Sequence, residues 1–211
     1  MPAPKIRPFI LPELAEGYAG DLDAGGYLDQ LRFAGLDGEI AADDVRFEQC
    51  EFSGLNADRF SLCNARVLQS ELNRVSAPVL AAAAVRLDEV RISHSRFGSA
   101  DLAESSVDSL LVENCKFGWL NLRGATLRDV EFRDCQFDEL DLGTLQRVRF
   151  TSSRTKVLAA HQAKLSSVDL TGLEFDMVDG VTGLRGAQVT QLQLMSLAPQ
   201  LADHLGIKIA G

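Results

Sequence analysis

The sequence lacks most of the features by which an enzyme or a membrane protein is recognised. No apolar run approaches the ~20 residues that a membrane-spanning helix needs. Neither a phosphate-binding glycine loop nor a G-x-S-x-G nucleophile motif occurs. The three histidines are scattered, and none has a metal-type partner at a fixed spacing. These absences favour a non-enzymatic protein that carries no cofactor and no metal.

Cysteine is scarce as well, because four thiols in 211 residues are too few for a disulfide framework. The segment from Met1 to Pro12 has only a three-residue apolar run between prolines, unlike a secretory signal. We therefore expect a reducing, cytoplasmic setting. Cys50, Cys115 and Cys135 fall at apolar positions of the pattern described next, so we expect small buried hydrophobes and not nucleophiles.

What the sequence does contain is a period of five residues that runs from Val45 to Thr144. In one unbroken frame, the third residue of all twenty blocks is apolar, and the first is small or apolar. Residues twenty apart also agree in type, as Phe97, Phe117 and Phe137 do. A period of five is neither the 3.6 of a helix nor the 2 of a strand, so the pattern indicates a repeat architecture.

Three blocks show the repeat most clearly: Ala100-Asp101-Leu102, Leu120 to Gly124, and Val168 to Gly172. They resemble the pentapeptide-repeat family, whose unit is a small or apolar residue, Asp or Asn, Leu or Phe, a polar residue and often Gly. The resemblance implies an all-β fold, a right-handed quadrilateral parallel β-helix with a short C-terminal α-helical cap. Four blocks would make one coil, with the first and third residue of each block pointing inward.

The expected organisation has three parts. Residues 1–19 form an extended arm, residues 20–185 form the β-helix, and residues 186–211 form a C-terminal helix and strand that cap or dimerise. We expect two irregularities in the repeat: one residue is missing near 41–44, and three residues are inserted at 145–147.

The C-terminal segment has its own helix signals. Thr190 can cap a helix that begins at Gln191, and Gly206 can end it. Leucines at three- and four-residue spacing form one apolar stripe, which Pro199 either kinks or divides between two short helices. The segment resembles the tail of mycobacterial gyrase-protecting family members, where a helix and a final strand pair two chains. This implies a homodimer, and the alternative is a monomeric cap. The dimer candidates are Leu192, Met195, Leu201, Leu205, Ile207 and Ile209.

The chain is acidic, with a net charge of −9, which argues against direct nucleic-acid binding. Residues 101–144 carry ten acidic and four basic side chains. Over two coils of about 4.8 Å each, that is one negative charge per ~1.6 Å, close to the ~1.7 Å of duplex DNA. The acidic residues, all expected to face outward, are Asp101, Glu104, Asp108, Glu113, Asp129, Glu131, Asp134, Asp138, Glu139 and Asp141.

Gyrase-protecting family members are acidic rods that imitate duplex DNA and shield bacterial type II topoisomerases from fluoroquinolones. The resemblance therefore implies a DNA-mimicking partner of DNA gyrase that inhibits the enzyme, protects it from quinolone-like poisons, or does both. Two alternatives stay open: the acidic residues form only a solvated face, or the chain is a general interaction scaffold. The scaffold would use an outward apolar patch of Val79, Leu111 and Trp119.

Overall fold

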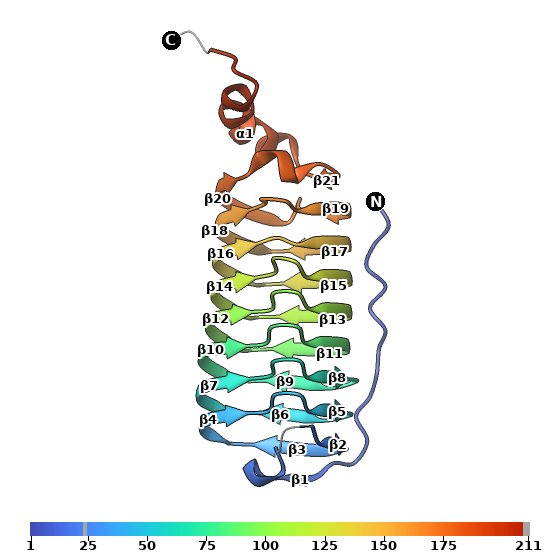
Figure 1. The fold of residues 1–211 in the computed structure, drawn as a ribbon. Coiled ribbons are helices and arrows are strands. Elements are labelled where there is room, and N and C mark those ends of the chain that lie inside the picture. Colours follow the sequence, from blue (N-terminus) through green and yellow to red (C-terminus); the bar gives the residue numbers. More distant parts are fainter. Residues whose placement is uncertain (23–24, 209–211) are drawn as a thin grey trace.

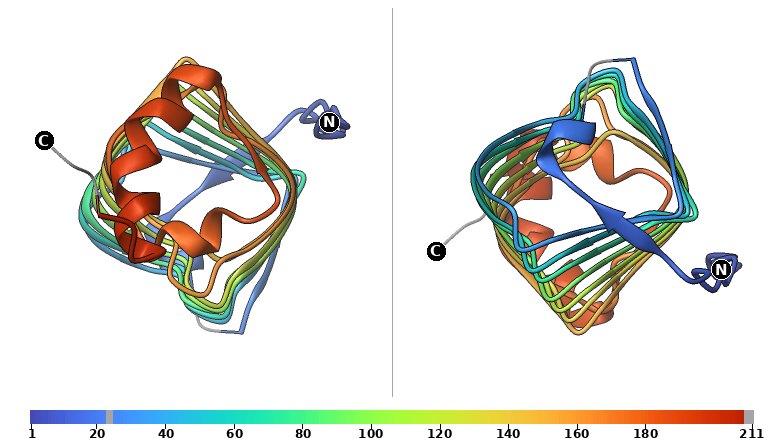
Figure 2. Two further views of the ribbon diagram at one scale, coloured as in Figure 1. Left: turned by 90° about the horizontal axis from the view of Figure 1, so that it is seen from above. Right: turned by 90° about the horizontal axis from the view of Figure 1, so that it is seen from below.

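The computed structural model describes residues 1–22 and 25–208, which form one rod of stacked coils (Figure 1). Seen along the rod, the coils have a quadrilateral outline (Figure 2). A complete coil takes 20 residues, because Arg86 pairs with Ser106 and Ser106 pairs with Thr126, both in parallel register. The all-β parallel β-helix expected from the five-residue period is confirmed.

The coils contribute strands to two parallel sheets. The larger sheet contains β1 (Ala15–Gly17), β2 (Tyr27–Asp29), β3 (Leu31–Ala34), β5 (Arg46–Glu48), β6 (Glu51–Ser53), β8 (Arg66–Leu68), β9 (Glu71–Asn73), β11 (Arg86–Ser93), β13 (Ser106–Glu113), β15 (Thr126–Arg133), β17 (Thr144–Thr151), β19 (Lys164–Asp169) and β21 (Ala187–Gln188). The smaller sheet contains β4 (Asp37–Ala41), β7 (Asn56–Ser61), β10 (Ser76–Ala81), β12 (Arg96–Asp101), β14 (Lys116–Asn121), β16 (Gln136–Asp141), β18 (Ser153–Ala159) and β20 (Leu173–Asp179). Two 3-10 turns, η1 (Ala19–Asp21) and η2 (Val181–Leu184), and helix α1 (Gln191–His204) lie at the ends.

Both inward registers are buried along the whole frame from Val45 to Thr144, as the period predicts. Phe97, Phe117 and Phe137 stack in one column, with successive ring centroids 5.5 and 5.4 Å apart. Cys115 and Cys135 lie in another column, and both thiols are free. Burial raises the pKa of Cys115 to about 11 and that of Cys135 to about 12, so both stay protonated.

Within a coil, the chain turns through residues in the left-handed region of backbone space. In the coil that starts at Arg86, these residues are Glu89, His94 and Glu104, with φ of 54°, 51° and 60°. An L-residue that has a Cβ adopts this backbone conformation at a cost in free energy, and glycine avoids that cost. Gly, Asn and Asp together occupy half of the positive-φ positions among the described residues, which fits the geometry of the corners.

The first irregularity of the repeat lies earlier than the sequence suggested. β4 pairs with β7 at Gly38 opposite Ala57, but at Glu39 opposite Arg59. One residue is therefore missing between Gly38 and Glu39, and not at 41–44. Gly38 has a φ of 74°, which lets the strand bulge at this point.

The second irregularity is a deletion, so the insertion expected at 145–147 is wrong. Thr126 pairs with Thr144 and Leu127 with Leu145, which makes this coil 18 residues long. The corner at 122–125 of the preceding coil is matched by only Leu142 and Gly143. A Cβ on Gly143 would lie 2.1 Å from the Leu122 carbonyl oxygen, so the shortened corner requires glycine. Leu145 is buried and belongs to the core.

The N-terminal arm, residues 1–14, lies along the outside of the rod: the N-terminus is beside β19, and the chain runs from there down to β1 (Figure 1). The Lys5 amide donates to Asp129 Oδ1 at 2.9 Å, and the Arg7 amide donates to Ser109 Oγ at 2.8 Å. The Arg91 guanidinium lies 4.7 Å from the ring centroid of Phe9. The arm therefore fastens to three coils far from it in sequence.

Helix α1 covers the C-terminal end of the rod (Figure 2). The Thr190 side chain accepts from the Gln193 amide, and the Gln193 side chain accepts from the Thr190 amide, which forms a capping box. Pro199 lies inside one continuous helix, so the expected division into two helices is wrong. Gly206 ends the helix with a φ of 70°. The strand expected at 207–209 is not seen at 207–208, and Ile209 lies outside the described residues.

Candidate binding faces

The ten acidic residues of 101–144 do not lie on one wall of the rod. Four are in strands of the larger sheet, four are in strands of the smaller sheet, and Glu104 and Asp134 are at corners. Those of the larger sheet are Asp108, Glu113, Asp129 and Glu131, and those of the smaller sheet are Asp101, Asp138, Glu139 and Asp141. The structure thus distributes this set around the rod.

Two of the ten do not face solvent, contrary to the sequence-based expectation. Asp129 is 6% exposed and accepts hydrogen bonds from Arg147 Nε at 2.7 Å and Arg147 Nη2 at 2.6 Å. These bonds from Arg147 hold the pKa of the Asp129 carboxyl below its usual value. Asp141 is 1% exposed, and its Oδ2 accepts from Trp119 Nε1 and from Arg123. Both carboxylates therefore serve the structure.

The larger sheet neutralises most of its own acidic side chains. Of the twelve in its strands, ten form ion pairs with arginines of the same sheet or of the arm. Glu113, for example, pairs with Arg133 at 2.6 Å, and Glu71 pairs with Arg91 at 2.9 Å. Single exposed pairs of this kind add little stability. Their consequence here is a face with almost no unbalanced negative charge.

The smaller sheet leaves most of its acidic side chains without an ion-pair partner. Its strands carry ten acidic residues, but only Asp138 and Asp141 pair with Lys or Arg within the described residues, and Asp179 lies 2.8 Å from the His161 imidazole. The carboxylates without a cationic partner there are Asp37, Glu39, Asp58, Asp101, Glu139, Glu174 and Asp176. The same strands also carry five cations, of which Arg59, Arg96, Lys116 and Arg154 form no ion pair within the described residues. Their net charge is −5, against −2 for the strands of the larger sheet, so the outer face of the smaller sheet is the more negative one, and we call it the acidic face.

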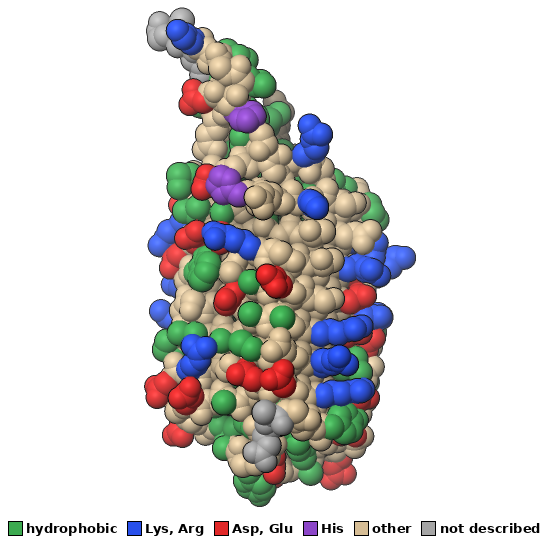
Figure 3. Space-filling model, viewed as in Figure 1, with side chains coloured by type: hydrophobic (Ala, Val, Ile, Leu, Met, Phe, Trp, Pro, Cys, Tyr) green, Lys and Arg blue, Asp and Glu red, His purple; other side chains and the backbone are tan. Residues whose placement is uncertain are grey.

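Positive side chains gather along one edge of the rod (Figure 3). Arg46, Arg66 and Arg86 stand in register on β5, β8 and β11. Like charges on neighbouring strands repel each other, so this row disfavours the compact rod unless solvent or a partner screens it. The row belongs to the larger sheet, so it adds positive charge to the side of the rod that is not the acidic face.

The predicted apolar patch is divided between the two sheets. Val79 and Trp119 share one column of the smaller sheet, as expected from their spacing of 40. Ser99 separates these two, and Glu139 separates Trp119 from Val157 and Met177 further along the column, where Met177 is 48% exposed. Leu111 stands on β13 of the larger sheet, between Arg91 and Glu131. It does not join the other two.

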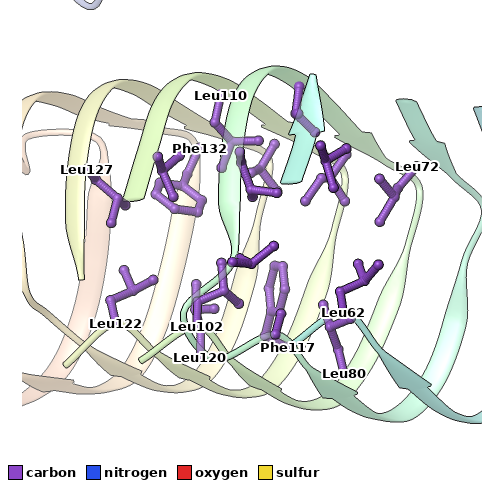
Figure 4. Close-up of a pocket in the computed structure, with 18 residues that line it drawn as sticks. Leu62, Leu72, Leu80, Leu102, Leu110, Phe117, Leu120, Leu122, Leu127 and Phe132 are labelled. Atoms are coloured by element: carbon purple, nitrogen blue, oxygen red, sulfur yellow. The ribbon is translucent and has the colours of Figure 1, made fainter. Parts of the chain in front are cut away.

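A void inside the rod is too small to hold a substrate. It measures about 40 Å³ and is lined by apolar side chains such as Leu72, Leu102 and Phe117 (Figure 4). The described residues hold no cluster of His, Cys, Asp or Glu that could bind a metal ion. None of the described helices is long and apolar enough to cross a membrane. The outer faces are thus the candidate functional surfaces.

The apolar residues predicted for dimerisation differ in their exposure. Leu192, Met195, Leu205 and Ile207 are 79, 64, 70 and 55% exposed. Leu201 packs against the end of the core together with buried Leu197. The first four therefore offer an apolar surface, whereas Leu201 serves the cap.

Comparisons with known proteins give solved structures of low similarity and no match in sequence. No protein-family model and no curated protein matches the chain in sequence. Solved structures of QnrB1, described as a plasmid-mediated fluoroquinolone resistance protein, are similar. The full-length QnrB1 structure is 15% identical over 83% of this chain and 100% of that one, with a TM-score of 0.29. A trypsin-treated QnrB1 variant is 14% identical over 89% and 91%, with a TM-score of 0.26.

Similarity at this level carries no argument about function. The fold is identified from the strand pairing of the chain itself. Residues 20 apart pair in parallel, so each coil has four sides of five residues, which is the geometry of a pentapeptide-repeat β-helix. The family expected from the sequence pattern therefore agrees with the observed coil.

Proposed function

We propose that the protein is a non-catalytic binding rod whose acidic face docks on a basic protein surface. The observation that carries this proposal is the contrast between the sheets: the larger one balances its carboxylates with arginines, and the smaller one leaves seven without a cationic partner in the described residues. Unbalanced charge concentrated on one face steers association with a surface of opposite sign.

The partner we propose is a bacterial type II topoisomerase, DNA gyrase. The pentapeptide-repeat resemblance supports this choice, because acidic rods of that family compete with DNA for the basic surface of the enzyme. Binding there would inhibit supercoiling, protect the enzyme from quinolone-like poisons, or do both. A gyrase partner would place the protein in the cytoplasm.

The mimicry of DNA would be partial. In the 101–144 window, six of the ten acidic residues have a cationic partner, so the DNA-like density inferred from sequence is too high. The eight strands of the smaller sheet span about 34 Å at ~4.8 Å per strand, and duplex DNA of that length carries about 20 charges. The smaller-sheet strands carry ten acidic and five basic side chains, a net charge of −5, which is about a quarter of that density. We expect a weaker salt dependence of binding than DNA itself shows.

Charge removal on each face tests the proposal. The triple variant Glu139→Gln, Glu174→Gln and Asp176→Asn removes three unbalanced charges from the acidic face. At about 0.5–1 kcal/mol for each, inhibition or protection of gyrase should need roughly 10- to 100-fold more protein. The measurement is a supercoiling assay with and without a fluoroquinolone.

The matched control removes three ion-paired carboxylates of the larger sheet: Glu48→Gln, Glu71→Gln and Glu113→Gln. It should shift the required concentration less than about threefold. Equal effects of the two triples would refute the assignment of the face. No effect of the wild-type protein on gyrase at micromolar concentration would refute the partner.

A second candidate is a general interaction scaffold on the same face. The column of Val79, Trp119, Val157 and Met177 favours it, because aromatic and Met side chains are enriched in interfaces. Trp119→Ala with all carboxylates intact separates the two candidates. Loss of a captured partner together with unchanged gyrase inhibition would favour the scaffold.

We also propose that two chains pair through α1. Five large apolar side chains are exposed in this segment, the four named above and Leu194, and a twofold axis would bury each set against its copy. Met195→Asp should halve the mass measured by light scattering, whereas Ser196→Asp on the same helix should not. A wild-type protein with the mass of one chain would exclude this dimer.

A further inference from the structure

The shortened coil leaves a hollow of about 630 Å³ in the wall of the rod. Its lower side is the corner at Arg123 and Gly124, and its upper side is the corner at His161 and Gln162. In a coil of 20 residues another corner would separate these two. Here the coil is two residues shorter, and the chain passes through Gly143 without forming that corner. The remaining lining residues are Asp141, Leu142, Thr144, Ala159 and Lys164.

The ladder of backbone hydrogen bonds along this edge stops at the hollow. In four successive corners the left-handed residue donates its amide to a carbonyl of the next coil, at 2.8–3.0 Å. These bonds run from Asp44 to Cys63, Asn64 to Ala83, Ala84 to Ala103 and Glu104 to Arg123. Gly124 comes next in this series, and its amide has no backbone acceptor in the described part of the chain. The carbonyl of His161, across the hollow, likewise accepts no backbone donor among the described residues.

A buried carboxylate adds a third unmet group. Asp141 is 1% exposed, and its Oδ1 has no hydrogen-bond partner within the described structure. A buried acceptor without a donor costs about 1–3 kcal/mol. The hollow therefore presents one backbone acceptor, the His161 carbonyl, and one backbone donor, the Gly124 amide, neither of which has a backbone partner among the described residues, and the buried Asp141 Oδ1 belongs to a residue of its lining.

This combination matches a peptide backbone better than a simple anion. An anion accepts from Gly124 and from Lys164 but has no donor for the His161 carbonyl. A peptide supplies carbonyls and amides in alternation, as the missing corner would have done. The gap between the two corners is about 9.6 Å, two strand spacings, which is the room for one extended strand.

We propose that the hollow binds a short extended peptide segment of a partner protein. The backbone of this segment would make the hydrogen bonds that the missing corner leaves unmade. One peptide carbonyl accepts from the Gly124 amide, and a peptide amide donates to the His161 carbonyl. The exposed Lys164 at the rim favours an acidic side chain in the bound segment. This site does not depend on the acidic face or on gyrase.

The direct test follows the Gly124 amide by NMR in the full-length, isotope-labelled protein. The probe is N-acetyl-glycyl-aspartyl amide, and sodium acetate and sodium phosphate are the comparison ligands. The peptide should move the Gly124 resonance in a saturable way at millimolar concentration, and the two anions should not. No movement at about 10 mM peptide, or equal movement with acetate, would overturn the proposal.

Two variants extend the test. Insertion of Ala-Asn between Leu142 and Gly143 restores a 20-residue coil, so it should raise the melting temperature and abolish the peptide response. Lys164→Glu leaves the backbone groups unchanged and should weaken the aspartyl peptide roughly 3- to 10-fold while strengthening N-acetyl-glycyl-lysyl amide. Full peptide binding by the insertion variant would overturn the proposal. If that variant does not fold, an unchanged preference in Lys164→Glu would do so.

Discussion

Asp129 and Arg147 offer the sharpest test of how the rod is held together. Asp129→Ala removes the carboxylate that accepts two hydrogen bonds from Arg147 and one from the Lys5 amide. Each bond to a charged group contributes about 1.5–3 kcal/mol when it is counted alone. The Arg147 side chain is 24% exposed, so solvent screens part of the loss. We expect a net loss of about 2–3 kcal/mol, which lowers the melting temperature by roughly 5–10 °C.

The matched control is Asp134→Ala. Asp134 has the same φ of 53° at the next corner, but it is exposed and has no ion pair within the described residues. Both variants share the cost of placing alanine in the left-handed region. The difference between them therefore isolates the Asp129 contacts, and it is measured by thermal and urea unfolding. Equal losses in the two variants would refute the reasoning.

The pH dependence gives an independent check. Because the pKa of Asp129 is lowered in the folded protein, its stabilisation is complete above the usual value near 3.8. It disappears as the pH falls through the lowered value. The stability difference between the wild type and Asp129→Ala should therefore be constant from pH 5 to 7 and shrink below about 3.8. A difference that persists in strong acid would contradict the charge-based account.

Four further predictions concern the core, the cysteines and the shortened corner. Gly143→Ala should lower the melting temperature sharply, because a Cβ there lies 2.1 Å from a carbonyl oxygen, whereas Gly20→Ala, which meets nothing within 4 Å, should be nearly neutral. Val90→Ile reaches the 40 Å³ void and should stabilise the protein by up to about 1 kcal/mol in urea unfolding, whereas Val130→Ile, away from the void, should destabilise it by overpacking. Stability should fall as the pH rises above about 9, because the Cys115 and Cys135 thiols ionise there in the unfolded chain but only near 11 and 12 in the fold. A thiol reagent should accordingly label half-buried Cys63 first, and fast labelling of Cys135 would contradict its burial.

The inner registers could be predicted from the sequence because burial acts on each inward residue separately. Phe97, Phe117 and Phe137 had to face a core, whatever the outside of the rod carries. The two irregularities were harder to place, because a missing residue and an inserted one shift the frame in related ways. Only the pairing of Thr126 with Thr144 distinguishes them.

The charges could not be assigned from the sequence for a different reason. A count along the chain treats Asp101 and Asp129 alike, although one is half-buried without a cationic partner in the described residues and the other is clamped by Arg147. Neutralisation depends on neighbours one coil away, and the arm adds Arg7 from about 80 residues away. The net charge counted over a stretch of sequence therefore overestimates the charge that the folded surface presents to a partner.

The strap-like course of the N-terminal arm has a consequence for how the rod unfolds. A stack of coils is held by nearest-neighbour contacts, so each end is free to fray without disturbing the middle. Arm contacts to Asp129, Ser109 and Arg91 span three coils at once, and losing any of those coils also releases the arm. Because the arm bridges the three consecutive coils of β11, β13 and β15, we expect the middle of the rod to open as one cooperative unit.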